Sequence, residues 1–154
     1  MELKQLSLSD REAITKVFLD VFTGDPWNDD WSDRTQLDAY ITDLAGQDGS
    51  LTLGWFDGET LVGLAMGNIR HWYSGTEYYI DEFCIHPARQ GQGEGTAFLQ
   101  AIEEYLKQNG IYQIFLQTEA DVPAYGFYTK RGFTEQKGHV SFAKELEQNR
   151  GMKQ

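Results

Sequence analysis

Residues 78–97 read YYIDEFCIHPARQGQGEGTA, and this stretch decides the fold. It begins as an apolar run typical of a strand, breaks at Pro87, and then places glycines in front of an amphipathic segment. Glycine allows backbone N–H groups to approach a ligand closely, and a helix N-terminus carries roughly half a positive charge. A strand, a glycine turn and a helix in this order therefore predict a cradle for a phosphate group.

The spacing of the glycines argues against two well-known cradles, although a nucleotide-binding protein remains a rival. Gly91, Gly93 and Gly95 are spaced G-x-G-x-G, and no lysine follows them as a P-loop requires. The dinucleotide fingerprint G-x-G-x-x-G does not match, and it belongs after the first strand of its fold, whereas only 59 residues follow Gly95 here. On spacing alone, a flexible turn at a helix start remains an equal alternative.

Two motifs make the chain similar to a known family. Residues 90–95, QGQGEG, match the acyl-coenzyme A signature Gln/Arg-x-x-Gly-x-Gly/Ala of the general N-acetyltransferase (GNAT) superfamily. Residues 124–133, AYGFYTKRGF, resemble its second motif, A-x-x-F-Y-x-x-x-G-F, and the order of elements agrees over nearly the whole chain. Two residues depart from the pattern: Glu94 replaces an aliphatic residue, and Asp121 stands where many relatives have Asn.

Hydrophobic periodicity predicts one mixed α/β domain over residues 1–154. We expect helices at 9–24, 33–46, 95–109 and 123–131, strands at 51–56, 60–69, 78–85 and 111–117, and a closing hairpin at 133–143. The resemblance implies the GNAT fold, in which a mostly antiparallel central sheet is splayed at the cofactor strand and flanked by about four helices.

The resemblance also implies that acetyl-CoA is the co-substrate. The strand before the glycines would bind the pantetheine arm, and the cradle amides would bind the pyrophosphate. The residues expected to contact acetyl-CoA are Phe83, Cys84, Ile85, Gln90, Gly91, Gln92, Gly93, Glu94, Gly95, Thr96, Asp121 and Tyr125. No base is evident beside Cys84, which favours a buried apolar role over a covalent one.

Direct attack of an amine on a thioester in a ternary complex requires a base. An alkyl amine with a pKa of ~10.4 must lose a proton at pH 7, which costs about 4–5 kcal/mol. Asp81 is the favoured base and Glu82 is close behind, with a water chain as a further route. Successive strand residues face opposite sides, so both can face the site only if a bulge intervenes. The alternative is a pair of solvated or salt-bridged carboxylates.

The leaving thiolate needs only a weak acid, because its parent pKa is ~8.5. Tyr128 matches the general-acid tyrosine of the GNAT family, and its alternative role is an aromatic anchor for the last helix. His71 and His86 are too far apart, with no third ligand in view, to indicate a metal site. We therefore expect Tyr128, Asp81 and Glu82 to be catalytic and no metal to be needed.

The charge of the chain indicates the acceptor. Lys and Arg number 13 against 24 Asp and Glu, a net charge of −11, which argues against nucleic acid and anionic membranes as partners. Residues 25–48 alone carry −6 and include two tryptophans, which suits a cation held by charge and cation–π attraction. The expected substrate-binding residues are Trp27, Asp30, Trp31 and Asp81. A solvated helix face with two core indoles is the alternative.

The segment containing Trp27 and Trp31 resembles acceptor segments of small bacterial acetyltransferases, including aminoglycoside-acetylating ones. A polyamine, an amino sugar or a lysine side chain would each fit. Rival functions are a non-catalytic acyl-CoA-binding or regulatory module on the same fold, and a protein acetyltransferase acting on lysine or an N-terminus. A cytoplasmic location is expected from the single cysteine and the absence of a visible signal peptide or membrane-spanning apolar segment. The resemblance also implies a possible homodimer, because many members of the family dimerise.

Overall fold

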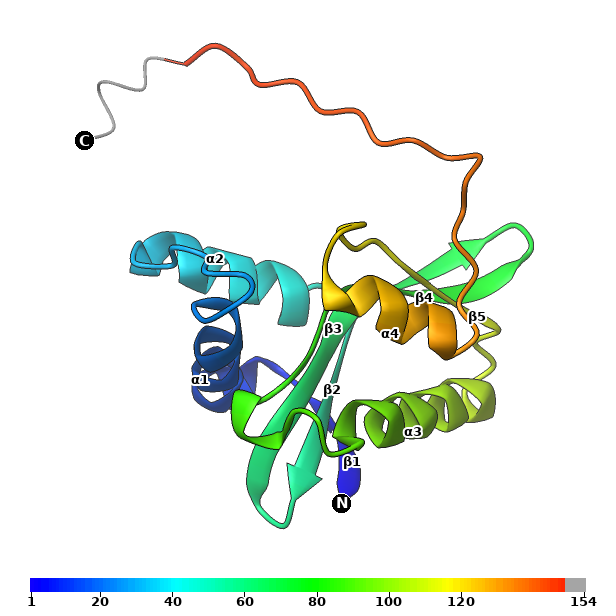
Figure 1. Cartoon of the computed structure of the whole chain (residues 1–154), viewed down its shortest axis with the longest axis horizontal. Coiled ribbons are helices and arrows are strands. Elements are labelled where there is room, and N and C mark those ends of the chain that lie inside the picture. Colours follow the sequence, from blue (N-terminus) through cyan, green and yellow to red (C-terminus); the bar gives the residue numbers. More distant parts are fainter. Residues whose placement is uncertain (149–154) are drawn as a thin grey trace.

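The computed structural model describes residues 1–148, so the last six residues of the expected domain lie outside it. A single sheet is flanked by helices on both sides (Figure 1). The elements in chain order are β1 (Glu2–Leu6), η1 (Leu8–Asp10), α1 (Arg11–Phe22), α2 (Arg34–Ala45), β2 (Ser50–Asp57), β3 (Thr60–Trp72), β4 (Gly75–Ile85), η2 (Pro87–Arg89), α3 (Glu94–Gln108), β5 (Gln113–Leu116) and α4 (Pro123–Lys130).

The five strands lie in the order β1-β2-β3-β4-β5. All neighbours are antiparallel except β4 and β5, which run parallel because α3 crosses between them. A tight hairpin at Gly58, where φ is +60°, joins β2 to β3 and pairs Asp57 with Thr60. The expected mixed α/β architecture with a mostly antiparallel sheet and four α-helices is thus confirmed.

Each face of the sheet has its own core. On one face the apolar stripes of α1 and α2 pack against Leu64 and Met66 of β3. On the other, Phe98, Ile102 and Leu106 of α3 pack against β2, β3 and β4. Apolar residues repeat at helical spacing, so each helix has one apolar face. Burial of these faces against the sheet holds the two helix layers in place on either side of β4. Among residues 1–148, no helix combines the length and apolar character needed to span a membrane.

Strand β4 changes its pairing halfway along. Its ladder with β5 ends at Ile80, which faces Leu116, so the rest of β4 separates from β5 as the resemblance implied. At the same level a bulge shifts the register with β3: Met66 faces Glu82, whereas the next residue, Gly67, faces Ile80. Asp81 is therefore the extra residue of the bulge.

Gly67 is what allows this bulge. A Cβ atom at Gly67 would lie 1.9 Å from the carbonyl oxygen of Tyr79, a distance that no side chain can occupy. A glycine inside a strand often marks a bulge or a close approach of backbone, and here it marks both. The close contact places the β4 backbone where two consecutive acidic residues can share one side.

Three expectations from the sequence need correction. The residues at 133–143 do not form a hairpin in the sheet: the His139 N–H closes a turn on the Gln136 carbonyl at 3.1 Å, but its flanks pair with no strand among the described residues. The chain leads away from the body instead, with Phe142 95% exposed (Figure 1). An apolar pattern at a sheet edge depends on tertiary pairing, which no local pattern encodes.

The other two corrections concern the N-terminus. Ser9 followed three residues later by Glu12 is a pattern that predicts a capping box at Ser9. The capping residue is instead Ser7, two residues earlier: its Oγ accepts the Ser9 N–H, and its own N–H donates to Asp10 Oδ2. Strand β1 has a mostly exposed, polar pattern without alternation, so hydrophobic periodicity does not predict it. It forms through pairing with β2.

Candidate active site

The glycine turn between β4 and α3 is shaped to receive an anion. Gly91 and Gly93 have φ angles of +77° and +79°, and no atom lies within 4 Å of where their Cβ atoms would be. Gly93 is also the N-cap of α3 and supplies no capping side chain. The first N–H groups of a 15-residue helix therefore point to an open turn without a side-chain cap, which fits the pyrophosphate of a coenzyme A ester.

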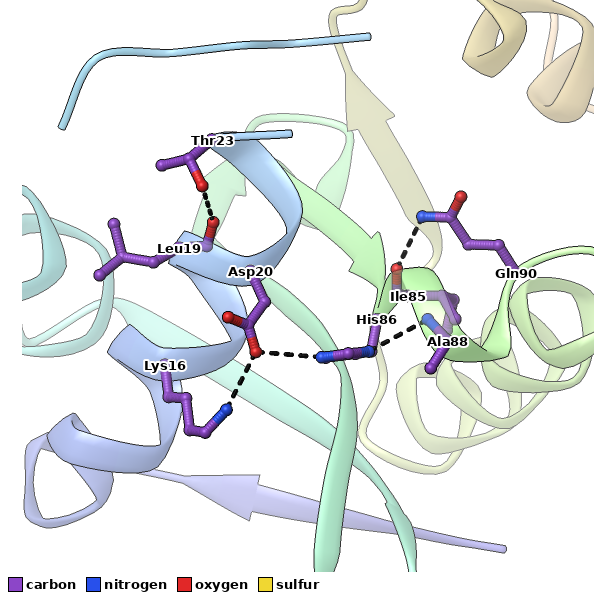
Figure 2. A network of polar contacts seen from close by, with 8 residues as sticks. All are labelled: Lys16, Leu19, Asp20, Thr23, Ile85, His86, Ala88 and Gln90. Atoms are coloured by element: carbon purple, nitrogen blue, oxygen red, sulfur yellow. Dashed lines mark hydrogen bonds and ion pairs between the residues drawn. The ribbon is translucent and has the colours of Figure 1, made fainter. Parts of the chain in front are cut away.

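A polar network ties this turn to α1 (Figure 2). His86 Nδ1 accepts the Ala88 N–H at 3.1 Å, so the ring proton is on Nε2, which lies 3.0 Å from Asp20 Oδ2. The hydrogen bond from Lys16 lowers the pKa of Asp20, and the bond to His86 lowers it further. Gln90 Nε2 donates to the Ile85 carbonyl at 3.0 Å. The start of the cradle is thus fixed from two sides.

The two charged side chains next to the cradle, Arg89 and Glu94, form polar contacts with residues of β2. Arg89 forms an ion pair with Asp57, and Glu94 Oε2 accepts the indole N–H of Trp55 at 3.3 Å. The residue that departs from the family pattern, Glu94, therefore has its carboxylate bonded to β2. The attraction for an anion comes from the backbone.

The residues that follow the cradle join α3 to α4. Thr96 Oγ1 accepts from Arg131 Nε at 2.7 Å, and a Cβ at Gly95 would lie 3.2 Å from the Phe127 ring. The Arg131 guanidinium also lies over that ring, 4.0 Å from its centroid. The Thr96 hydroxyl and Gly95 thus serve the packing of α3 against α4.

Beyond Ile80, where β4 separates from β5, the main-chain groups on that edge of β4 have no partner in β5. The side chains of residues 83–85 pack into the two cores. Phe83 stacks on Phe98 on the α3 face, with centroids 5.4 Å apart. Cys84 lies in the opposite core and is 6% exposed, and burial raises the pKa of its thiol to about 12. Ile85 is buried as well. A thiol held this firmly protonated is a poor nucleophile.

The two carboxylates of the bulge lie together in the wall of an open groove of about 1570 Å³. Glu82 Oε2 accepts the Tyr40 hydroxyl at 2.5 Å. Burial raises the pKa of Glu82 to about 7, the Tyr40 bond opposes this, and nearby Asp81 and Asp29 add to it. Asp81 is more open to solvent, and its partial burial raises its pKa against the pull of Arg70.

Tyr128 of α4 lines the same groove. Its ring packs edge-on against Phe83 and Phe133, with centroids 6.2 Å and 5.2 Å away. Burial raises the pKa of its phenol, with further contributions from Cys84 and Glu82. At neutral pH it is therefore a protonated donor in the same groove as the β4 carboxylates, consistent with both the acid role and the anchor role.

The connection between α1 and α2 covers one end of the groove. Trp27 and Asp29 line it. Trp31 stacks on Tyr40, with centroids 5.3 Å apart and planes at 13°, and its buried indole N–H has no hydrogen-bond partner among the described residues. Asp30 turns instead to Ser32, whose N–H donates to it at 3.0 Å, and hydrogen bonding from the Ser32 side chain and then from its backbone lowers the pKa of Asp30.

The structure brings most of the expected residues together, with exceptions. Asp121 is exposed in the loop before α4, and the Tyr125 hydroxyl donates to Glu135 at 2.6 Å. Gln92 Nε2 reaches only the Ala88 carbonyl, at 3.4 Å. Among residues 1–148, no group of three His, Cys, Asp or Glu side chains is placed to hold a metal ion. Residues that sequence reasoning missed are Asp29, Tyr40 and Gly67.

Comparisons with known proteins agree with this geometry. A model of the acetyltransferase (GNAT) family matches residues 11–133. Aminoglycoside N(6')-acetyltransferase type 1 from Stenotrophomonas maltophilia is 31% identical over 125 residues, 76% of this chain and 81% of that protein.

Solved structures show the same fold. An aminoglycoside acetyltransferase from an uncultured soil metagenomic sample, in complex with sisomicin, has a TM-score of 0.72 at 19% identity and covers 95% of this chain and 96% of its own. AAC(6')-Iy, in complex with the bisubstrate analogue CoA-S-monomethyl-acetylneamine, gives 0.70 at 16% identity, covering 94% and 98%. With the family model spanning both motifs and the splayed strand, the chain belongs to the GNAT family of acetyltransferases.

Proposed function

We propose that the chain transfers an acetyl group from acetyl-CoA to a primary amine of a cationic small molecule, by direct attack in a ternary complex. The observation that carries this is the placement of Glu82, Asp81 and Tyr128 in one groove, next to an uncapped helix N-terminus that suits a pyrophosphate. An aminoglycoside-like amine is the acceptor we favour, since the 31% identical relative is named for that substrate class.

Glu82 is the base in this proposal, in preference to Asp81. A carboxyl with a pKa of about 7 is near half ionised at neutral pH, which suits a group that must both accept and release a proton. Asp81, closer to solvent, would add negative charge that attracts the ammonium form of the acceptor. The ammonium gives its proton to Glu82, and the free amine then attacks the thioester carbonyl.

Tyr128 is the acid. As the new C–N bond forms and the C–S bond breaks, the sulfur gains the electron pair and Tyr128 protonates it. The nitrogen still carries one proton more than the amide keeps, and it gives that proton to the ionised Tyr128, while the protonated Glu82 releases its proton to solvent. Burial raises the pKa of Tyr128, so the proton moves to the sulfur in step with the transfer from nitrogen that restores the phenol, and the thiolate needs only about 2 kcal/mol of help at pH 7. The groove itself, with Trp27 and Asp29 at one end, would hold the acceptor.

The test is release of CoA thiol in the presence of acetyl-CoA and a panel of amines: aminoglycosides such as sisomicin, polyamines, amino acids and peptides with free N-termini. We expect turnover with aminoglycosides, and an about 100-fold lower kcat for Tyr128→Phe, the low end of the contribution of one proton transfer. Turnover with peptides alone would indicate a protein acetyltransferase. CoA binding without turnover on any amine would favour a regulatory module.

A further inference from the structure

We propose that Tyr40 is a positioning residue for Glu82. Its hydroxyl donates to Glu82 Oε2 at 2.5 Å, which leaves Oε1 as the oxygen to take the proton of an incoming amine. The bond joins α2 to β4 across 42 residues of sequence, and neither GNAT motif includes Tyr40. The inference rests on the proposed function in so far as it makes Glu82 the base.

The Tyr40 ring is held so that its hydroxyl cannot easily swing away. One face stacks on Trp31, at 5.3 Å between centroids and 13° between planes. The ring also meets Phe18 of α1 edge-on, at 5.9 Å and 64°. Two separate segments therefore fix this tyrosine, and through it they fix the carboxylate that the proposed reaction needs.

The charges around Glu82 show why a donor is required there. The titratable groups that face it come from the α1–α2 connection, α2, β4 and α4. They are Asp29, Tyr40, Asp81, Cys84 and Tyr128. Asp29 and Asp81 disfavour a further negative charge, and so does burial, whereas the hydrogen bond from Tyr40 favours the ionised carboxylate. Burial and then the neighbouring Glu82 carboxylate raise the pKa of Tyr40 itself, so it remains a donor.

The variant that tests this is Tyr40→Phe, which keeps the ring and its stacking and removes only the hydroxyl. The pKa of Glu82 would be followed without substrate by NMR titration of protein carrying 13C in its glutamate carboxyls, with Glu82→Gln to assign the signal. We expect the pKa to rise by about one unit, a tenfold change in proton affinity, because a hydrogen bond to the charged form is lost. An unchanged pKa would overturn the proposal.

The kinetic readout is the acid limb of kcat/KM in thiol release. In Tyr40→Phe we expect it to move to higher pH by the same amount, with kcat recovering in alkaline buffer and the KM for acetyl-CoA unchanged. A general structural defect would lower activity at every pH. An acid limb that stays in place while the NMR pKa moves would also overturn the role of Tyr40 in the reaction.

Tyr105→Phe is the matched control. Tyr105 lies on α3 and its hydroxyl bonds to Gln5 at 3.4 Å, far from Glu82 in the fold, so its loss should leave the titration unchanged. Thermal unfolding of both variants verifies that they fold. The two proposals fail separately: a wild-type protein that acetylates no amine contradicts the proposed function, whereas the Glu82 titration reports on Tyr40 without any turnover.

Discussion

The glycine cradle and the carboxylate pair of β4 are suited to opposite charges by different means. The cradle after β4 uses backbone amides, and the side chains of Arg89 and Glu94 beside it are bonded to β2. The β4 wall uses carboxylate side chains, which a bulge brings to one side. A protein with a net charge of −11 can thus be shaped for an anionic co-substrate, because helix and glycine dipoles need no net positive charge.

The largest expected effect comes from removing the base on the acidic wall. Glu82→Gln keeps the size of the side chain but cannot accept a proton, so kcat with an aminoglycoside should fall by about 10²- to 10⁴-fold. Binding of CoA, measured by calorimetry, should stay within about twofold, because the cradle is untouched. A loss of CoA affinity equal to the loss in kcat would show that the glycine cradle and the β4 carboxylates are not independent.

The same variant should be more stable than the wild type at alkaline pH. The pKa of Glu82 is raised in the folded state, so the native protein binds this proton more tightly than the unfolded chain does. Stability is therefore lost as pH rises from about 4.5 through about 7, and Gln avoids that loss, which is on the order of 1–3 kcal/mol. Urea unfolding at pH 5 and pH 8 measures it. Asp81→Asn, at a more open site, should show a smaller effect in both assays.

The next largest effect is expected from a change that disrupts the cradle and leaves the carboxylates intact. Gly93→Ala places a side chain at a φ of +79°, which costs about 1–2 kcal/mol and turns the amides away from a ligand. We expect the Kd for CoA to rise about tenfold, with the KM for the amine unchanged. Gly110→Ala is the control, because its φ is +72° with the same empty surroundings, but it lies beyond the far end of α3. It should lose stability and keep CoA affinity.

The glycine cradle could be predicted from the sequence more fully than the arrangement of the β4 carboxylates, for physical reasons. The cradle is contiguous, so its position could be predicted from residues 90–95, although the glycine spacing alone left a flexible turn as an equal alternative and the resemblance to the GNAT family was needed to choose between them. Asp81 and Glu82 were recognised as a pair, but the bulge that puts both on one side depends on the partner strand. An isolated Gly67 inside a strand pattern was the available signal. The choice of Asp29 over Asp30, and the contact of Tyr40 with Glu82, depend on how a loop and a helix pack, which no local pattern carries.

The smallest expected effect concerns Glu94, the acidic residue beside the cradle. Trp55→Phe preserves the stacking on Phe98, where centroids are 5.4 Å apart, and removes the indole N–H that binds the Glu94 carboxylate. Glu94 is the first residue of α3, so a released carboxylate can turn to the helix N-terminal amides and compete with an anionic ligand there. We expect the Kd for CoA to rise about fivefold, the equivalent of one hydrogen bond of ~1 kcal/mol.

The double variant decides between competition and simple loss of packing. If Glu94 competes for the amides, Trp55→Phe/Glu94→Gln should recover most of the CoA affinity, because a neutral amide is a weaker rival for the helix N-terminus than a carboxylate. If Trp55→Phe weakens binding only by disturbing the sheet, the double variant should bind no better than the single one. Recovery would mean that the Trp55 indole N–H, by binding the Glu94 carboxylate, prevents that carboxylate from occupying the N-terminal amides of α3.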